Sequence, residues 1–313
     1  MSSTSPETPT VAASASESTV PPRDTTFLDN EVPVILKDGR KLTTYRAGKP
    51  DAPNAIVLET GGTVAGAYWG LVVEQMEAIA GNSFQIVVYD RAGYGTSSPA
   101  NDYRTLRDLA NDLNEVLDSL TFQHVVLVGH SWGGPIIRVA ASLRPDKASI
   151  AGLVLVDATD ELCPAYFGWY RSMAFWGQSW LFQPMAWTGR LREKKALNLS
   201  KFPEPYRTAT IDKSTHMNGA RAAAYELGNI TAQLTWLRDN PADIGSIPVT
   251  VVSAQMGNAA GSMRAMLIEA HKQRAELAGK NGKYVPAEKS MHNIPTSQPD
   301  LIANEAVSLF AKV

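Results

Sequence analysis

The 313-residue sequence contains a single cysteine, Cys163. One cysteine cannot form an intrachain disulfide framework, and it cannot supply a zinc site that needs several cysteines. An unpaired cysteine is more often a packed core residue than a nucleophile. We therefore expect no disulfide, and we predict that Cys163 is buried.

An excess of charge of one sign and long apolar runs are also missing. Lys and Arg total 29 against 31 Asp and Glu, which gives a formal net charge of −2, so the chain lacks the basic excess that phosphate contacts require. No uninterrupted apolar run approaches the roughly 20 residues that span a bilayer. These absences argue against nucleic-acid binding and against stable membrane anchoring, and we expect a soluble, cytoplasmic protein. The oligomeric state stays open.

Residues 1–24 differ in composition from the rest of the chain, because they are rich in Ser, Thr, Pro, Ala and Glu. They lack the apolar stretch of a secretion signal and the arginines of a transit peptide. Such a segment cannot bury enough surface to offset the entropy lost on ordering. We predict a flexible N-terminal tail.

Beyond this tail, short apolar runs rich in β-branched residues alternate with amphipathic helical patterns. Strands are predicted over residues 32–36, 41–46, 54–58, 84–90, 125–128, 152–157, 247–253 and 283–288. Strands of this kind, separated by helices, predict an α/β fold with a mostly parallel sheet and helices on both faces. Right-handed crossovers then bring the strand exits to one edge, where sites of such sheets form.

The alternation stops over residues 160–240, a helical stretch that is rich in aromatic side chains. We therefore predict a core of residues 25–159 and 241–313 that carries an inserted helical cap of residues 160–240. The cap has too many aromatic residues for all of them to pack internally. Four are predicted to line a substrate pocket and to favour a fairly bulky apolar substrate: Trp176, Trp180, Phe182 and Trp187.

The strand over 125–128 runs into Gly129-His-Ser-Trp-Gly133, and a helical pattern follows at once. A serine at the apex of a strand-to-helix turn holds its hydroxyl clear of the backbone, and glycines two positions away on either side keep side chains out of the turn. The new helix directs backbone N–H groups toward that serine. This order predicts Ser131 as a nucleophile.

A serine needs a base, and five histidines are available. His292 lies in a loop between the last strand and the last helix, on the same sheet edge as Ser131, and is the predicted base. The other four are assigned structural or surface positions: His124 at a strand start, His130 pointing away from the Ser131 hydroxyl, His216 in the insertion and His271 on a solvated helix face.

These motifs resemble the α/β-hydrolase fold superfamily, which includes epoxide hydrolases, haloalkane dehalogenases, esterases and lactonases. The resemblance covers the chain from about residue 30 onward. It rests on residues 129–133, on Asp90-Arg-Ala-Gly-Tyr-Gly95, and on Ser290-Met-His-Asn-Ile294. It also rests on residues 59–63, the glycine loop that follows Leu58. It implies an esterase- or lactonase-like serine hydrolase, because epoxide hydrolases and dehalogenases of this fold use an aspartate nucleophile. We call the strand-to-helix turn at residues 129–133 the elbow. Residues 90–95 are interpreted as a structural turn that supports it.

The resemblance places the third member of the triad in one of two loops. The usual loop, after the strand that follows the cap, is Ser253-Ala-Gln-Met-Gly-Asn258 here and has no carboxylate. Some family members carry the acid one strand earlier, and that strand ends in Asp157. We therefore predict Asp157 as the acid, although an aspartate there can also serve a cap hinge. Asp160 and Glu161 are alternatives, and Asn258 is a neutral one.

The expected reaction is hydrolysis of a carboxylic ester or lactone through an acyl-enzyme, with no metal or organic cofactor. The oxyanion would be held by the amides of Trp132 and Gly62, with Gly61 and Thr63 as neighbours of the second donor. A plain turn is the alternative interpretation of the glycine loop. An amidase, a carbon–carbon bond hydrolase, a cofactor-free perhydrolase and a non-catalytic ligand-binding protein also remain open.

Overall fold

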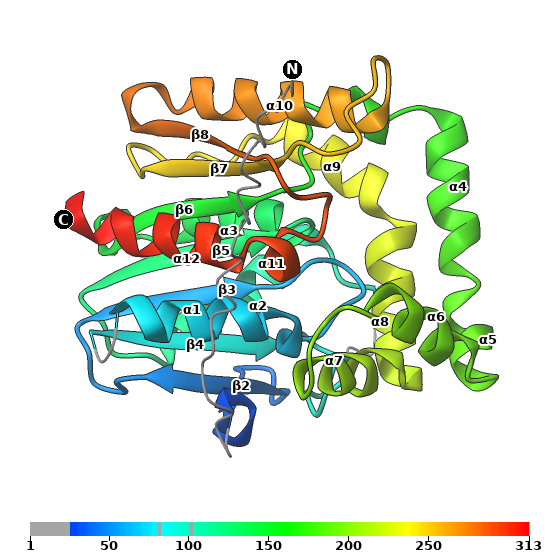
Figure 1. The fold of residues 1–313 in the computed structure, drawn as a ribbon, viewed down its shortest axis with the longest axis horizontal. Helices are drawn as coiled ribbons and strands as arrows, with labels where there is room; N and C mark the ends of the chain where they lie inside the picture. Colours follow the sequence, from blue (N-terminus) through cyan, green and yellow to red (C-terminus); the bar gives the residue numbers. More distant parts are fainter. Residues whose placement is uncertain (1–25, 81–82, 100–102, 313) are drawn as a thin grey trace, which may run out of the picture.

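The structure, a computed structural model, describes residues 26–80, 83–99 and 103–312, so the predicted tail over 1–24 lies outside the described residues. Eight strands form one sheet in the order β1-β2-β4-β3-β5-β6-β7-β8. The strands are β1 (Glu31–Ile35), β2 (Lys41–Gly48), β3 (Asn54–Glu59), β4 (Phe84–Asp90), β5 (His124–His130), β6 (Ile150–Val156), β7 (Val249–Ala254) and β8 (Gly282–Ala287). Only the pairs β1–β2 and β2–β4 are antiparallel. The predicted mostly parallel sheet is confirmed (Figure 1).

The central strand β5 shows why its sequence is apolar without a break. Val125 and Leu127 point into one hydrophobic cluster, and Val126 and Val128 point into a second cluster on the opposite face. Alternate side chains of a strand face opposite sides, so a strand covered on both sides needs apolar residues at every position. The two clusters are the two halves of the core.

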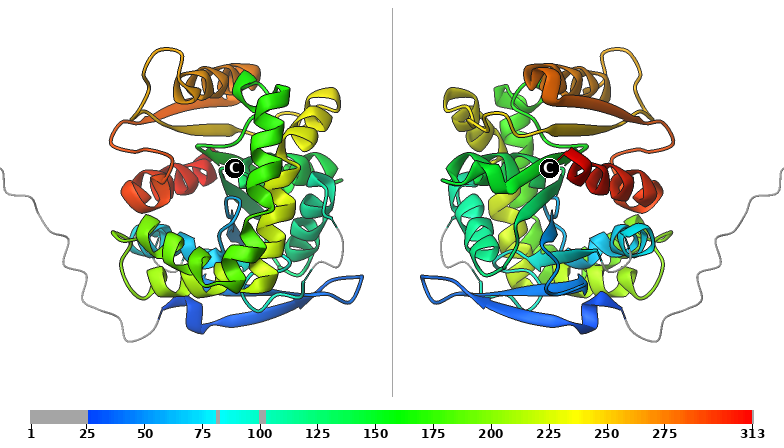
Figure 2. Two further views of the ribbon diagram at one scale, coloured as in Figure 1. Left: turned by 90° about the vertical axis from the view of Figure 1, so that its right-hand side faces the viewer. Right: turned by 90° about the vertical axis from the view of Figure 1, so that its left-hand side faces the viewer.

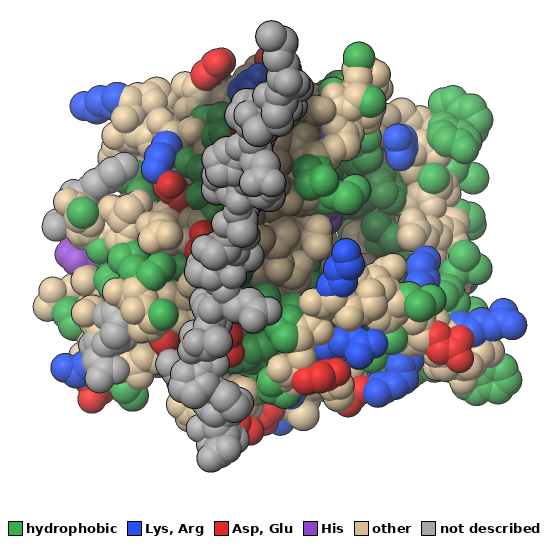
Figure 3. Space-filling view, viewed as in Figure 1, with side chains coloured by type: hydrophobic (Ala, Val, Ile, Leu, Met, Phe, Trp, Pro, Cys, Tyr) green, Lys and Arg blue, Asp and Glu red, His purple; other side chains and the backbone are tan. Residues whose placement is uncertain are grey.

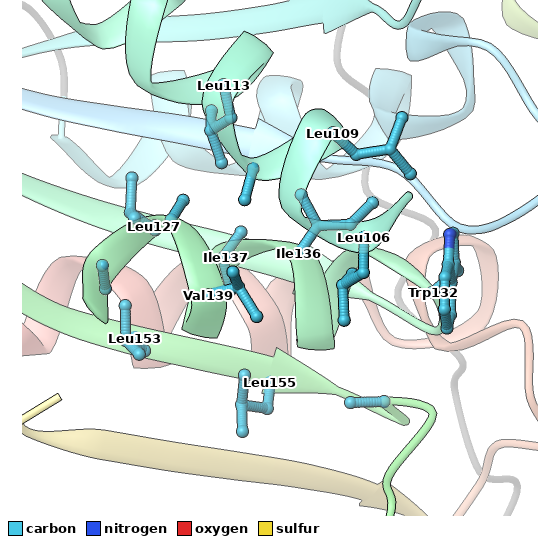
Figure 4. Close-up of a cluster of buried hydrophobic side chains, with 14 of the residues drawn as sticks. Leu106, Leu109, Leu113, Leu127, Trp132, Ile136, Ile137, Val139, Leu153 and Leu155 are labelled. Carbon is cyan, nitrogen blue, oxygen red and sulfur yellow. The ribbon is translucent and has the colours of Figure 1, made fainter. Parts of the chain in front are cut away.

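Helices cover both faces of the sheet. The first cluster includes side chains of α2 (Leu106–Asp118), α3 (Gly133–Leu143) and α10 (Met263–Leu277), and Figure 4 shows the interdigitation of α2 and α3 with β5 and β6. The second cluster includes side chains of α1 (Gly70–Ala80) and α12 (Pro299–Ser308). The short α11 (Ile294–Ser297) precedes α12. Cys163 is buried in the first cluster, as predicted.

Six helices occupy the chain between β6 and β7. They are α4 (Trp169–Ser179), α5 (Phe182–Trp187), α6 (Arg190–Asn198), α7 (Tyr206–Thr215), α8 (Met217–Gly228) and α9 (Ile230–Asp239). They lie beyond the carboxyl ends of the parallel strands, and α4 runs along the outside of this layer (Figures 1 and 2). We call these six helices the cap. Within the described residues, no helix is both long enough and apolar enough to cross a bilayer.

Burial predicts a large difference between two leucines on helices of the core. Leu113 on α2 is fully buried, whereas Leu277 at the end of α10 is 64% exposed. Leu113→Ala should lower the free energy of unfolding by roughly 2–5 kcal/mol, because it removes buried methyl groups and leaves a cavity. Leu277→Ala should change it by less than about 0.5 kcal/mol. Urea unfolding at pH 7 measures both, and equal losses would contradict the placement of α2 against the sheet.

Candidate active site

Ser131 lies at the turn between β5 and α3 with a left-handed backbone, at a φ of 51°. Its amide donates to the carbonyl of Val156 over 3.0 Å. Its own carbonyl accepts from the amides of Gly134 and Thr159, at 3.0 and 2.9 Å. A non-glycine residue holds such a conformation only where its surroundings enforce it. Here hydrogen bonds to the neighbouring strand exit and to α3 do so.

The elbow glycines are required by close backbone approach, as the sequence predicts. A Cβ on Gly129 would lie 2.5 Å from the carbonyl oxygen of Gly133, and a Cβ on Gly133 would lie 2.5 Å from the carbonyl oxygen of Glu59. Real Cβ atoms do not come so close to backbone oxygens. Gly61 approaches from the side of β3, where a Cβ would be 3.2 Å from the Cβ of Ser131. The elbow therefore packs directly against the glycine loop.

The structure brings the three predicted triad residues together. His292, in the loop after β8, has its Nε2 3.0 Å from the Oγ of Ser131. Its Nδ1 lies 2.6 Å from Oδ2 of Asp157. With a carboxylate at Nδ1, that nitrogen carries the proton and donates it, which leaves the Nε2 lone pair facing the serine hydroxyl. This is the arrangement that a general base for Ser131 needs.

Asp157 is fully buried at the exit of β6, with a φ of 41°. Its Oδ1 accepts from the amide of Ala254, and Arg264 on α10 donates to both oxygens, at 2.6 and 2.9 Å. Burial alone would raise the pKa of Asp157, but the hydrogen bonds from His292 and Arg264 outweigh it and hold the pKa well below its usual value. The carboxylate is therefore ionised at neutral pH. No motif in the sequence pointed to Arg264.

The alternative acids are held elsewhere. Asp160 accepts two hydrogen bonds from Arg274, both at 2.9 Å. Glu161 accepts from Arg138 and from Arg274. Asn258 lies exposed in the loop after β7. Among the described residues, Asp157 alone is a carboxylate within hydrogen-bond distance of the His292 ring.

Two further histidines lie near the triad. His130 is buried and donates from Nε2 to the carbonyl of His292 over 2.9 Å, so it fixes the loop that carries the base. The prediction for His271 is wrong: it is fully buried, with ring nitrogens 2.8 Å from Ser253 Oγ and from the carbonyl of Ala158. Its charged neighbours in sequence suggested a solvated face, but positions 267, 271 and 275 form the face of α10 that packs on the sheet.

The glycine loop is held in place by the buried side chain of Arg91, the residue that follows β4. Arg91 forms ion pairs with Glu59 of β3 and with Glu226 of the cap helix α8, at 2.5 and 2.8 Å. The same guanidinium donates to the carbonyls of Thr60 and Gly61, both at 2.8 Å. The turn after β4 thus supports the glycine loop, whereas its predicted support of the elbow stays a prediction.

The bond to the Gly61 carbonyl determines where the Gly62 amide points. The carbonyl of Gly61 and the N–H of Gly62 belong to one trans peptide group, in which the two bonds point in opposite directions. Because Arg91 draws the carbonyl to one side, the N–H points away from Arg91. Gly62 and Trp132 line one cavity with Ser131. A charged donor on the carbonyl also polarises the amide and strengthens it as a donor.

Two adjoining cavities, of about 370 and 920 Å³, share Ser131 and His292. Phe182 lines the smaller one, as predicted, together with Leu181 and Met185. Trp176, Trp180 and Trp187 line neither of the two, which corrects the sequence-based prediction. Their side chains are 51, 65 and 82% exposed, so they face solvent instead.

Lys195 of α6 also faces both cavities. Its Nζ donates to the carbonyl of Thr63, next to Gly62, over 2.6 Å. Burial lowers the pKa of Lys195 to about 8, and the charge of Lys194 acts in the same direction. Within the described part of the chain, no three His, Cys, Asp or Glu side chains are grouped as metal ligands.

A sequence model for the alpha/beta hydrolase fold matches residues 54–296, more than half of the chain. The chain therefore belongs to the α/β hydrolase fold family.

Particular relatives match shorter segments. Epoxide hydrolase B of Mycobacterium tuberculosis is 37% identical over 82 residues, 25% of this chain and 23% of that protein. A putative carbamate hydrolase, RutD, of Rhizobium rhizogenes is 33% identical over 117 residues, 37% of this chain and 42% of that protein. The chain thus matches less than half the length of either relative. The structure of an esterase from Exiguobacterium antarcticum covers 90% of this chain and 99% of its own, with a TM-score of 0.68 and 18% identity, a likeness of fold.

The buried state of His130 predicts a specific pH dependence of stability. Burial lowers the pKa of His130 to about 3, and the nearby His292 contributes in the same direction. In the unfolded chain the pKa is about 6.5, so below that pH the unfolded state binds a proton that the folded state does not. The free energy of unfolding should therefore fall as the pH drops, by roughly 2–3 kcal/mol between pH 6.5 and 4.5 from this residue.

His130→Gln tests this contribution because it keeps an N–H donor for the His292 carbonyl without a titrating ring. Urea unfolding at several pH values measures the free energy of unfolding of both proteins. Between pH 6.5 and 4.5 the variant should lose roughly 2–3 kcal/mol less than the wild type. His271 contributes equally to both proteins. Parallel pH profiles would show that His130 can be protonated in the folded state.

Proposed function

We propose that the protein is a serine hydrolase that cleaves a carboxylic ester or lactone through an acyl-enzyme. The observation that carries the proposal is the continuous chain of hydrogen bonds from Ser131 through His292 to the buried carboxylate of Asp157. A serine hydroxyl becomes a nucleophile when an oriented base accepts its proton. Membership of the fold family supports a hydrolase activity. The arrangement of Ser131, His292 and Asp157 supports acyl transfer through the serine as the type of reaction.

In the proposed reaction, Ser131 Oγ attacks the substrate carbonyl while His292 Nε2 accepts its proton. The amides of Gly62 and Trp132 stabilise the oxyanion of the tetrahedral intermediate. His292 then protonates the departing alcohol oxygen, which leaves the acyl group on Ser131. Water attacks this acyl-enzyme with His292 again as base, and the acid is released. Asp157, kept ionised by Arg264, stabilises the protonated imidazole in both halves.

The residue at the elbow argues against an epoxide substrate, although some relatives are named epoxide hydrolases. An enzyme that opens an epoxide through a covalent intermediate must then release its product. Its nucleophile must therefore form a bond that water can cleave. A carboxylate forms an ester, which hydrolyses, but Ser131 would form an ether, which does not. An acyl substrate gives an ester on Ser131, so it suits this site.

The smaller cavity supports an acyl or alcohol group of substantial size. Its volume of about 370 Å³ is in the range of small-molecule sites, and apolar side chains of α5, of α6 and of the connection between α4 and α5 form one wall. Leu181, Phe182, Met185 and Leu191 contribute to this wall. A fairly bulky apolar group fits it, which keeps the substrate class predicted from the sequence while replacing the tryptophans by these residues.

Ser131 can be tested by turnover and by covalent trapping. Ser131→Ala should lower kcat/KM for a p-nitrophenyl ester by at least roughly 10³-fold, because the nucleophile is lost. A fluorophosphonate probe should label the wild type once, and peptide mass spectrometry should place the adduct on Ser131. A non-catalytic binding protein would neither turn over the ester nor take up the label.

Asp157 has a separate test with a matched control. Asp157→Asn should lower kcat by about 10⁴-fold, because the amide favours the wrong histidine tautomer. Asn258→Ala should leave kcat unchanged, since Asn258 lies exposed in its loop. A normal kcat for Asp157→Asn, with only a lower melting temperature or a changed KM, would assign this residue to the cap hinge instead.

A further inference from the structure

The outer side of the cap exposes a continuous series of large apolar side chains. Trp169, Met173, Trp176 and Trp180 follow one another at steps of four, three and four residues along α4, so they lie on one face of the helix. They are 80, 57, 51 and 65% exposed. We call the following set the outer cap surface: Trp169, Tyr170, Met173, Trp176, Trp180, Leu181 and Trp187.

The outer cap surface is largely exposed, although Met173 and Trp176 also line a hollow with residues of α8 and α9. Ser172, Phe175 and Ser179, about a quarter turn around α4 from this face, are the less exposed residues of the helix, and α4 contacts α8. Figure 2 shows α4 as the outermost helix on the side that faces the viewer in its left panel, and Figure 3 shows apolar side chains along the same rim. Exposed apolar side chains gathered in one place mark an interaction surface.

The same segment is strongly basic. Residues 169–201 contain one acid, Glu193, although the whole chain carries a net charge of −2. Basic side chains lie over α6 and α7 in Figure 3, beside the apolar rim, with acidic side chains among them. Arg192 pairs with Asp212 of α7, and Lys195 faces the two cavities. The basic residues of the segment are Arg171, Arg190, Arg192, Lys194, Lys195 and Lys201.

We propose that the outer cap surface docks reversibly on an anionic lipid bilayer. Tryptophan and tyrosine side chains favour the membrane–water interface, where an apolar ring and a polar N–H or O–H are both accommodated. Neighbouring Lys and Arg side chains gain from the negative potential of anionic headgroups. Such a surface lies in the interface without spanning it, which is consistent with the absence of a spanning helix among the described residues.

Charge favours lipid over a second copy of the chain. A two-fold dimer through the outer cap surface would place the same basic segment of both copies side by side. An anionic bilayer instead complements this charge. Leu181 is both 56% exposed and part of the wall of the smaller cavity, so an apolar substrate dissolved in the bilayer would enter close to the docked surface.

The test is vesicle co-sedimentation of the full chain without any substrate. At 50 mM NaCl, binding to phosphatidylcholine vesicles with 30% phosphatidylglycerol should be at least tenfold tighter than to phosphatidylcholine alone, and it should weaken at 500 mM NaCl. Trp169→Gln/Trp180→Gln/Trp187→Gln should weaken it at least tenfold. Ile35→Gln/Leu277→Gln, which alters two exposed residues outside the cap, should not. Far-UV circular dichroism and melting temperature check that both variants fold.

Equal binding by the two variants would overturn the proposal, as would failure of the wild type to bind anionic vesicles. A wild-type dimer in buffer that the triple variant abolishes, with no vesicle binding by either protein, would assign the outer cap surface to a second copy. Because binding is measured without turnover, its failure is distinct from failure of the proposed hydrolase activity.

Discussion

The left-handed backbone of Ser131 is the constraint on which the rest of the site depends. A residue of this kind stores on the order of 1–3 kcal/mol of strain, and it persists because β6 holds it. The Val156 carbonyl and the Thr159 amide, on either side of Asp157, both bond to Ser131. The hydrogen bonds that enforce the elbow therefore also place Asp157 beside it. Asp157 has a positive φ of its own, so two strained residues occupy neighbouring strand exits.

The position of Asp157, one strand earlier than the loop in which the resemblance to the family places the acid, has an electrostatic consequence. A fully buried carboxylate is costly unless its charge is compensated by hydrogen bonds. The last residue of β7 supplies the Ala254 amide, and α10 supplies Arg264. Residues 253–258, where the resemblance places the acid, instead provide one donor to Asp157, the Ala254 amide. Arg264 therefore belongs to the triad's support even though it touches neither Ser131 nor His292.

The sequence predicted the features that depend on local pattern. Continuous apolar strands, the elbow glycines and the histidine after the last strand all follow from spacing along a short segment. Features that depend on distant partners were missed: Arg264 pairs with Asp157 across 107 positions, and Arg91 with Glu226 across 135. His271 was misplaced because the charges beside it do not report which face of α10 is buried.

The direction of the cap tryptophans was missed for a related reason. Aromatic content alone does not distinguish a cavity wall from an outer face. The helical period of α4 does make that distinction once its inner face is known, because Phe175 and Ser179 face the rest of the cap. The smaller side chains after α4, above all Leu181 and Met185, line the cavity instead.

Arg91 links the turn after β4 to both the glycine loop and the cap. Its guanidinium is shared between the carbonyls of the glycine loop and a carboxylate of α8, so one buried cation holds the Gly62 peptide and the cap together. Glu226 also lines the smaller cavity, next to Gly62. A displacement of α8 that moved Glu226 would therefore leave Arg91 partly unpaired and loosen its hold on the Gly61–Gly62 peptide group, whose N–H is a proposed oxyanion donor. The geometry of the proposed oxyanion site and the position of the cap are linked through this single side chain.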